Sequence, residues 1–264
     1  VTWYKDRKRV SITYDIKLKI KDTYVTLGDS EDLLPKPDRV DISARALEWY
    51  VYNSDYSVFR MVAVKDGVVV GFFTNARDFN TTVGIAYGKR PVSVWTRGVK
   101  VMVYEDKIFK EIGGVLVIKD GVYGSGDIKS EDYLKTQARE LFDIVNCYRV
   151  SCWRPALEWD EYAAKASRDH SRDMAKNNYF DNASADGTPA SVRYSKYSKE
   201  NWTAVGENIY AGSPYACDAF FSLLNSLGKR GNLLSRAYNY SGVGVAYSED
   251  SDYDYYFTQM FVAR

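Results

Sequence analysis

The sequence predicts an α+β protein of two domains, with a strand-rich domain at residues 1–128 and a mixed domain at residues 129–264. Three observations lead to this prediction. Val-, Ile-, Tyr- and Phe-rich segments of strand length fill the first half, and apolar residues at helical spacing begin only after residue 130. The length of 264 residues also favours two domains, because domains of about 100 to 150 residues are the common size.

The first domain is predicted to consist of β-strands. Segments rich in β-branched and aromatic residues lie at 10–20, 49–52, 59–64, 68–74, 92–95, 99–104 and 114–118. Asp66-Gly67 predicts a hairpin turn between two of them, because glycine accepts positive φ without steric cost. Asp120-Gly121 follows the last segment, and we expect residues 123–127, with two glycines and a serine, to form the linker.

The second domain is predicted to begin with two helices. The first has an apolar face whose members are three and four residues apart: Leu134, Ala138, Leu141, Phe142 and Val145. The second is expected to start after the N-cap residue Asp160 and to end near Asn177. Its inward stripe is expected to contain Ala163, Ala166, His170 and Met174, with Ser167 beside them.

The rest of the second domain is predicted to alternate between helix and strand. Ser213-Pro214 is expected to open a third helix, since proline suits the first helical turn. That helix would bury Ala219, Phe220, Leu223 and Leu224. Segments 243–247 and 255–262 are strand-like. The aromatic cluster 253–256 could stack on sugar rings. The simpler interpretation is that half of the cluster belongs to the core, because successive residues of a strand point to opposite faces.

Composition excludes some classes of function. The net charge is +1 and both halves are close to neutral, so we expect no nucleic-acid partner. No apolar run approaches the roughly 20 residues of a membrane helix, so we expect no transmembrane segment within residues 1–264. Aromatic residues make up 15% of the chain, and its 23 tyrosines suit wet surfaces and binding grooves.

The cysteines and the single histidine are weak candidates for chemistry. Three cysteines leave at least one unpaired in a monomer; Cys147 and Cys152 could form a disulfide across a tight turn, or both could be free. With Cys217 they make a poor zinc site. Because His170 lies on the inward stripe of its helix, we expect it to pack there rather than act in catalysis.

Short segments in the second half resemble the CAP superfamily, which includes cysteine-rich secretory proteins, insect antigens and plant pathogenesis-related proteins. In chain order they are HSRDMA at 170–175, YFDNAS at 179–184, DGTP at 186–189, GENI at 206–209, NSLGKR at 225–230, NLL at 232–234, GVG at 242–244 and YFTQMF at 256–261. Their spacing is closest to that of bacterial members. Segments 48–52, 61–71 and 74–75 resemble the accessory domain that precedes the CAP domain in some Gram-positive proteins.

The resemblance implies an α-β-α sandwich for residues 129–264 and a secreted or cell-envelope location. The family cleft typically holds two histidines and two acidic residues, and its histidines bind zinc in several members. Here the histidine positions are Asn182 and Lys229, Glu207 is retained, and the second acidic position falls near Ser226. With only one histidine in the chain, we expect no metal and no cofactor.

The candidate ligand cleft therefore comprises Asn182, Glu207, Asn208 and Lys229. Lys229 could form an ion pair with Glu207 where the family has a metal. Glu207 itself could be structural or could bind a ligand, and Asn182 could bind a polar ligand or be a turn residue.

Two functions follow from this cleft. We favour a non-catalytic binding module for a cell-wall glycan, a lipid or a protein. The alternative is a metal-independent hydrolase of cell wall or peptide, with Glu207 as its general acid or base. Glycoside hydrolysis usually needs a pair of carboxylates, and the sequence supplies only one at this site.

Overall fold

The computed structural model of the chain describes residues 2–5, 8–11, 17–42, 46–53, 55–56, 58–75, 99–100, 114–119 and 126–264. The chain divides into two compact units, Val1–Asp127 and Ile128–Arg264. The first unit is rich in strands and the second combines helices with a sheet, so the predicted α+β class is confirmed. Among the described helices, none has both the length and the apolar character needed to cross a bilayer.

The first unit is built on an antiparallel sheet in the order β5-β6-β7-β8-β10-β9. Its strands are β5 (Arg39–Ile42), β6 (Glu48–Asn53), β7 (Phe59–Lys65), β8 (Val68–Asn75), β9 (Val99–Lys100) and β10 (Gly114–Lys119). The predicted Asp66-Gly67 hairpin is confirmed: it joins β7 to β8, and both residues have positive φ, 51° and 74°.

Two hairpins and a short 3-10 helix precede this sheet. The hairpins pair β1 (Thr2–Lys5) with β2 (Lys8–Ser11) and β3 (Lys17–Ile20) with β4 (Thr23–Thr26), and η1 covers Glu31–Leu33. Of the strand predicted at 10–20, the structure describes only the two ends, which belong to β2 and β3, and residues 12–16 lie outside the described residues. The expected strand 92–95, most of 99–104 and the Asp120-Gly121 turn lie outside the described residues.

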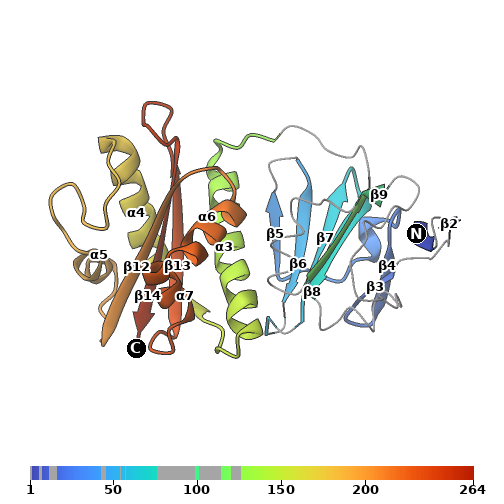
Figure 1. Cartoon of the computed structure of the whole chain (residues 1–264), viewed down its shortest axis with the longest axis horizontal. Helices are drawn as coiled ribbons and strands as arrows, with labels where there is room; N and C mark the ends of the chain where they lie inside the picture. The colour runs from blue at the N-terminus through green and yellow to red at the C-terminus, as the bar shows by residue number, and fades with distance from the viewer. Residues whose placement is uncertain are drawn as a thin grey trace. The chain divides into compact units, whose positions relative to one another are not determined.

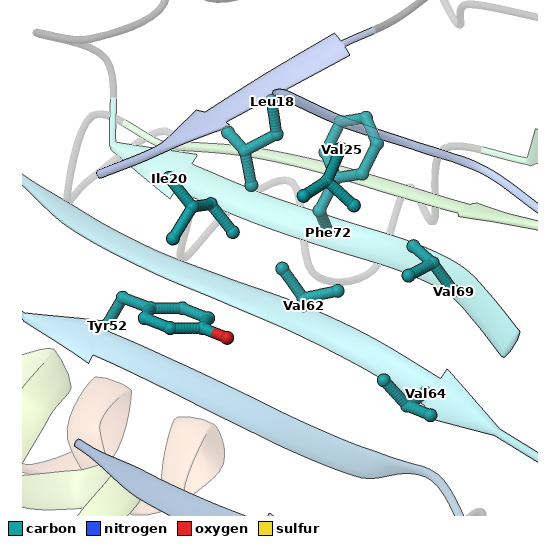
Figure 2. Packing of buried hydrophobic residues seen from close by; sticks show 8 residues of the cluster. All are labelled: Leu18, Ile20, Val25, Tyr52, Val62, Val64, Val69 and Phe72. Carbon is teal, nitrogen blue, oxygen red and sulfur yellow. The ribbon is translucent and has the colours of Figure 1, made fainter. Parts of the chain in front are cut away.

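The core of the first unit lies between the β3–β4 hairpin and one face of the sheet (Figure 2). Leu18, Ile20 and Val25 of the hairpin are no more than 1% exposed. They pack with residues of β6, β7 and β8, namely Tyr52, Val62, Val64, Val69 and Phe72. This unit thus buries its own apolar face and has its own core.

The second unit has one sheet in the order β11-β13-β14-β12, with helices on both faces (Figure 1). Its strands are β11 (Glu158–Trp159), β12 (Ala204–Gly212), β13 (Tyr240–Tyr247) and β14 (Tyr255–Ala263). Its helices are α3 (Glu131–Ser151), α4 (Glu161–Asn177), α5 (Ala190–Tyr197), α6 (Ala216–Asn225) and α7 (Leu227–Leu234). Helices α4 and α5 cover one face and α3, α6 and α7 the other, which is the expected α-β-α sandwich (Figure 1).

The first two predicted helices of this unit are confirmed. The predicted apolar face of α3 is buried, and Asp160 caps α4 by accepting hydrogen bonds from the backbone of Tyr162 and Ala163. The expected start of the third helix is wrong, because α6 begins at Ala216. Ser213 instead forms hydrogen bonds just before the helix: its hydroxyl donates to Asp218 in the first turn of α6 and accepts from the backbone of Tyr215.

Two glycines of β13 let α4 lie directly on the sheet. A Cβ at Gly242 would come 2.1 Å from the backbone nitrogen of Ala164, and one at Gly244 would come 2.0 Å from that of Arg168. Ser167 and Ser171 use this closeness, because their hydroxyls donate to the carbonyls of the two glycines. Residues 242–244 are therefore the surface on which α4 packs, and the two glycines set the distance between α4 and the sheet.

No disulfide joins any two of the three cysteines, all of which lie in the described part of the chain. Cys147 is buried inside α3, and burial raises the pKa of its thiol well above the ordinary value. Cys152 is the C-cap of the same helix, five positions later, so the two side chains leave the helix in different directions. Helical geometry therefore rules out the disulfide that the short spacing allowed.

Candidate functional site

Glu207 lies on β12, an edge strand of the sheet, and points to the face covered by α4 and α5. Its neighbours on that face are apolar: Val205 packs against the α4–α5 cluster and Ile209 against Met174 of α4. The alternation of a strand thus sends a carboxylate into an otherwise hydrophobic layer. Its side chain is only 3% exposed.

Arg193 of α5 neutralises this buried carboxylate. Its Nη2 donates to both oxygens of Glu207, at 2.8 Å to Oε1 and 2.6 Å to Oε2, and the Arg193 side chain is 5% exposed. The same guanidinium donates to the carbonyls of Asn182 and Thr188 and to the hydroxyl of Ser184. One cation therefore joins the edge strand to the loop between α4 and α5.

Burial and pairing shift the pKa of Glu207 in opposite directions. Desolvation raises the pKa of Glu207 above its usual range, and the charge and hydrogen bonds of Arg193 oppose that rise. Asn182 adds a hydrogen bond from its Nδ2 to Oε1 at 3.2 Å. Both oxygens of the Glu207 carboxylate thus accept hydrogen bonds from other side chains of the protein.

His170 lies on α4 with its Nε2 3.8 Å from Glu207 Oε1, and it is fully buried, as predicted for a packing histidine. Its Nε2 donates to the carbonyl of Asp181 at 3.0 Å, which assigns the ring proton to Nε2. Burial, with the nearby charge of Arg193, lowers the pKa of His170 to about 4. The ring is therefore neutral at pH 7, and its 3.8 Å approach to Glu207 is not an ion pair.

The candidate residues fall on two sides of β12. Asn182 lies beside Glu207, whereas Asn208 is 1% exposed and faces α7. The side chain of Asn208 donates to the carbonyl of Lys229 and accepts from Asn232. Adjacent strand residues point to opposite faces, so the structure does not bring Asn208 to the Glu207 carboxylate.

Lys229 does not pair with Glu207, which corrects the ion pair considered from sequence. Its Nζ donates to the carbonyl of Ile209 at 2.8 Å, and burial lowers the pKa of this amine. Asn232 donates to the carbonyl of Glu207 in the same way, at 3.2 Å. Both side chains come from α7 and satisfy carbonyls on the open edge of β12, as edge strands require.

An aromatic pair lies next to Lys229, and we call it the aromatic rim: Phe180 and Tyr253. Phe180 is 40% exposed, Tyr253 is 47% exposed, and their ring centroids are 5.9 Å apart. The Lys229 ammonium is 5.4 Å from the centroid of Phe180. Tyr253 precedes β14, and the two tyrosines that begin this strand are buried, Tyr255 at 5% and Tyr256 at 0%. The cluster is divided between surface and core, but at the start of the strand and not by the expected alternation of faces.

Arg193 is the residue that sequence reasoning missed. It lies in the eight-residue helix α5, which was not predicted, and it follows Pro189, the N-cap of that helix. The Thr188-Pro189 pair is a helix-start signal that could have revealed α5. Nothing in the sequence distinguishes Arg193 from Lys229 as the partner of Glu207, since the choice depends on which side of β12 the glutamate faces.

The residues at the family's histidine positions do not fit zinc. Asn182 offers an amide, the Lys229 amine is occupied by a carbonyl, and Glu207 is held by Arg193. Within the described parts of the chain, no group of three or more His, Cys, Asp or Glu side chains could hold a metal ion. No metal-dependent step can be derived for this site.

Comparison with known proteins places these features in a family. Residues 142–261 match the cysteine-rich secretory protein family (CAP), and residues 25–100 match the CAP-associated N-terminal family. A Bacillus subtilis relative, the uncharacterized membrane protein YlbC, is 26% identical over 286 residues, which cover 88% of this chain and 79% of the relative.

Two solved structures share the fold across both units. An extracellular protein containing an SCP domain from Bacillus anthracis has a TM-score of 0.64 at 24% identity, covering 97% of this chain and 99% of the other. A cysteine-rich secretory protein from Staphylococcus aureus has a TM-score of 0.58 at 13% identity, covering 90% of this chain and 91% of the other. These relatives are described as extracellular, secretory or membrane proteins.

Proposed function

The chain is a CAP-domain protein of the bacterial type, with a CAP-associated N-terminal domain before its CAP domain, and we propose that it is a non-catalytic binding module of the cell envelope. Its ligand in this proposal is a cell-wall glycan, and the family cleft has lost its metal and catalytic functions. The descriptions of its relatives as extracellular, secretory or membrane proteins support an envelope location.

The burial and pairing of Glu207 carry the proposal. A general acid or base must reach the proton that it transfers. The Glu207 side chain is 3% exposed and its oxygens already accept hydrogen bonds from Arg193 and Asn182. A carboxylate held in this way stabilises the loop between α4 and α5 and is closed to a substrate.

The alternative, a metal-independent hydrolase using Glu207, loses support from the same geometry. Glycoside hydrolysis usually needs two carboxylates about 5 to 10 Å apart on either side of the bond. Among the described residues, the hydrogen-bond donors to the Glu207 carboxylate are Arg193 and Asn182, and neither can act as a second carboxylate. The neutral His170 is fully buried and cannot serve as the missing partner.

The aromatic rim favours a glycan over a lipid or a protein. Phe180 and Tyr253 present partly exposed ring faces beside the Lys229 amine. Exposed rings next to polar groups suit sugar rings, which have apolar faces and hydroxyl edges. In the proposal, the rim stacks on sugar rings, and the outward side of Asn182 adds hydrogen bonds.

Co-sedimentation with purified Gram-positive peptidoglycan tests this proposal. We expect the intact protein to pellet with the wall, and Phe180→Ser and Tyr253→Ser each to weaken binding about tenfold. Tyr162→Ser is the matched control, because Tyr162 is a 40% exposed aromatic residue on α4, away from the rim. Its binding should equal that of the unchanged protein.

Three results would contradict the proposal. Equal losses in the rim and control variants would show that binding does not use the rim. Absence of pelleting, with binding instead to phospholipid vesicles or to a protein, would reject the glycan as ligand. Release of soluble fragments that depends on Glu207 would restore the hydrolase.

A further inference from the structure

The two edges of the CAP-domain sheet are covered to different extents. At the β12 edge, Lys229 and Asn232 of α7 donate to outward carbonyls of the strand. At the other edge, β11 pairs with β13 only at Tyr240 and Ser241, and the chain then turns into α4. Among the described residues, no strand pairs with this edge of β13 beyond Ser241. The rest of β13 therefore has an open edge.

The backbone of Val243 and Val245 faces this open edge. The carbonyl of Ser241 accepts a hydrogen bond from the backbone of Asp160, so it points away from β14. Backbone groups of every second residue in a strand point to the same edge, so the N–H and C=O groups of both valines point that way too. No described residue outside β13 forms a hydrogen bond with these four groups. Because strand edges of this kind can pair with another chain, the open edge can accept an added strand.

A hollow of about 230 Å³ lies along the same edge, between α3 on one face of the sheet and α4 on the other (Figure 1). Its lining includes Trp159 of β11 and residues 243–245 of β13, so it continues the line of β11 where that strand ends. Gly244 has no side chain, so the backbone of β13 itself forms part of the wall. At roughly 30 Å³ per water molecule, the hollow holds about eight non-hydrogen atoms, as many as the backbone of two residues.

The charged side chains around the hollow favour an acidic ligand. The lining contains three cations and two acids, namely Lys135, Arg139, Arg168, Glu131 and Glu161. Both acids are already paired, Glu131 with Arg172 at 2.8 Å and Glu161 with Arg139 at 3.3 Å. Arg168 of α4 forms no ion pair with any described residue. A carboxylate on a strand in the hollow could therefore pair with Arg168.

We infer that the open edge of β13 is a docking site for an extended, acidic peptide segment of another protein, which adds to the sheet as a strand between α3 and α4. A second folded copy does not fit, because its own β13 edge lies between the same two helices. The aromatic rim does not line this hollow, so the inference goes beyond the proposed glycan binding, and the two can fail separately.

NMR of the whole chain labelled with ¹⁵N-valine tests the inference at the open edge itself. The probe is the blocked peptide acetyl-Glu-Val-Thr-Val-Glu-amide, which combines strand-forming residues with two carboxylates. We expect the amide protons of Val243 and Val245 to move downfield in a saturable titration, since each gains a hydrogen-bond acceptor. The same peptide with all its backbone nitrogens methylated cannot donate to the edge, and its effect should be at least tenfold smaller at equal concentration. A version with lysine in place of both glutamates should also act at least tenfold more weakly.

Two cations of α4 provide matched variants. Arg168 lines the hollow, whereas Lys165 is exposed on the same helix and is not among the lining residues. We expect Arg168→Glu to weaken binding of the acidic peptide at least tenfold and Lys165→Glu to leave it unchanged. The inference is overturned if the two valine resonances do not move, if the methylated peptide acts equally, or if the two variants behave alike. Movement of these resonances on raising the protein concentration alone would identify a second copy as the occupant and would also overturn it.

Discussion

Replacing Arg193 by methionine removes the cation that neutralises Glu207. The change leaves a carboxylate that is 3% exposed, with Asn182 as its remaining hydrogen-bond donor among the described residues. Breaking one half of a buried ion pair costs roughly 3 to 5 kcal/mol. Most residues of the loop at 181–189 are exposed, so water is close to the site, and we expect the lower end, about 3 kcal/mol of lost stability at pH 7.

The loss should shrink as the pH falls. Burial raises the pKa of Glu207 in the intact protein, and removing Arg193 raises it further. A carboxyl whose pKa is higher in the folded state than in the unfolded state gains stability from proton uptake on folding, so lower pH favours folding. The Arg193→Met protein should therefore recover part of its lost stability between pH 7 and pH 5.

A double-mutant cycle separates the pair from its surroundings. We expect Glu207→Gln to cost about 2 kcal/mol, and the double variant to cost at least ~1.5 kcal/mol less than the sum of the single changes. The control is Arg172→Met, whose partner Glu131 is on the surface, with side chains 51% and 56% exposed. That change should cost no more than about 0.5 kcal/mol.

Urea unfolding followed by tryptophan fluorescence measures these values, with one transition fitted for each of the two units. The reasoning is refuted if Arg193→Met costs no more than Arg172→Met. It is also refuted if the effects of Arg193→Met and Glu207→Gln simply add, because a neutralising pair must be coupled.

Three further predictions follow from the same structure. Burial lowers the pKa of His170 to about 4, so as the pH falls the unfolded state takes up a proton before the folded state does. Stability that is present above pH 6.5 is therefore lost as the pH falls toward 4. After allowance for screening, urea unfolding should show that the intact protein loses roughly 1 kcal/mol more stability between pH 7 and pH 5 than His170→Gln does, and equal losses in the two proteins would contradict this. Gly244→Ala should lower stability by about 3 kcal/mol, since its Cβ would sit 2.0 Å from the backbone of Arg168. Gly228→Ala in α7, whose Cβ meets nothing within 4 Å, should lose nothing; similar melting temperatures for the two variants would show that α4 does not depend on the glycine contact. Lys229→Met should cost only about 1 kcal/mol in urea unfolding, the value of its hydrogen bond to Ile209, and a cost as large as that of Arg193→Met would identify Lys229 as a partner of Glu207 after all.

Sequence patterns predicted the elements whose periodicity is long and regular. The apolar face of α3 and the capped, amphipathic α4 have no competing interpretation. The predicted face of α3 is buried, and α4 begins after Asp160 and ends at Asn177 as predicted. The two closing strands were likewise visible, although β14 is buried on both faces and shows no alternation. The short helices α5 and α7 were not predicted, because eight residues carry too few apolar positions to define a face.

The site was only half accessible from sequence. The family pattern located Glu207 and Asn182, which the structure brings together. It could not give the side of the sheet on which each neighbour lies, so Asn208 was grouped with the wrong face. The partner of Glu207 depends on a tertiary contact between β12 and α5, and no local signal in the sequence encodes that contact.

The most direct test of the central claim, that Glu207 stabilises the fold and performs no chemistry, is an assay of soluble fragments released from purified Gram-positive peptidoglycan. The intact protein and Glu207→Gln are compared side by side with EDTA present, and both are first shown to be folded. We predict that neither protein releases fragments and that both pellet with the wall. Release by the intact protein that disappears in Glu207→Gln would contradict the account and identify a metal-independent hydrolase.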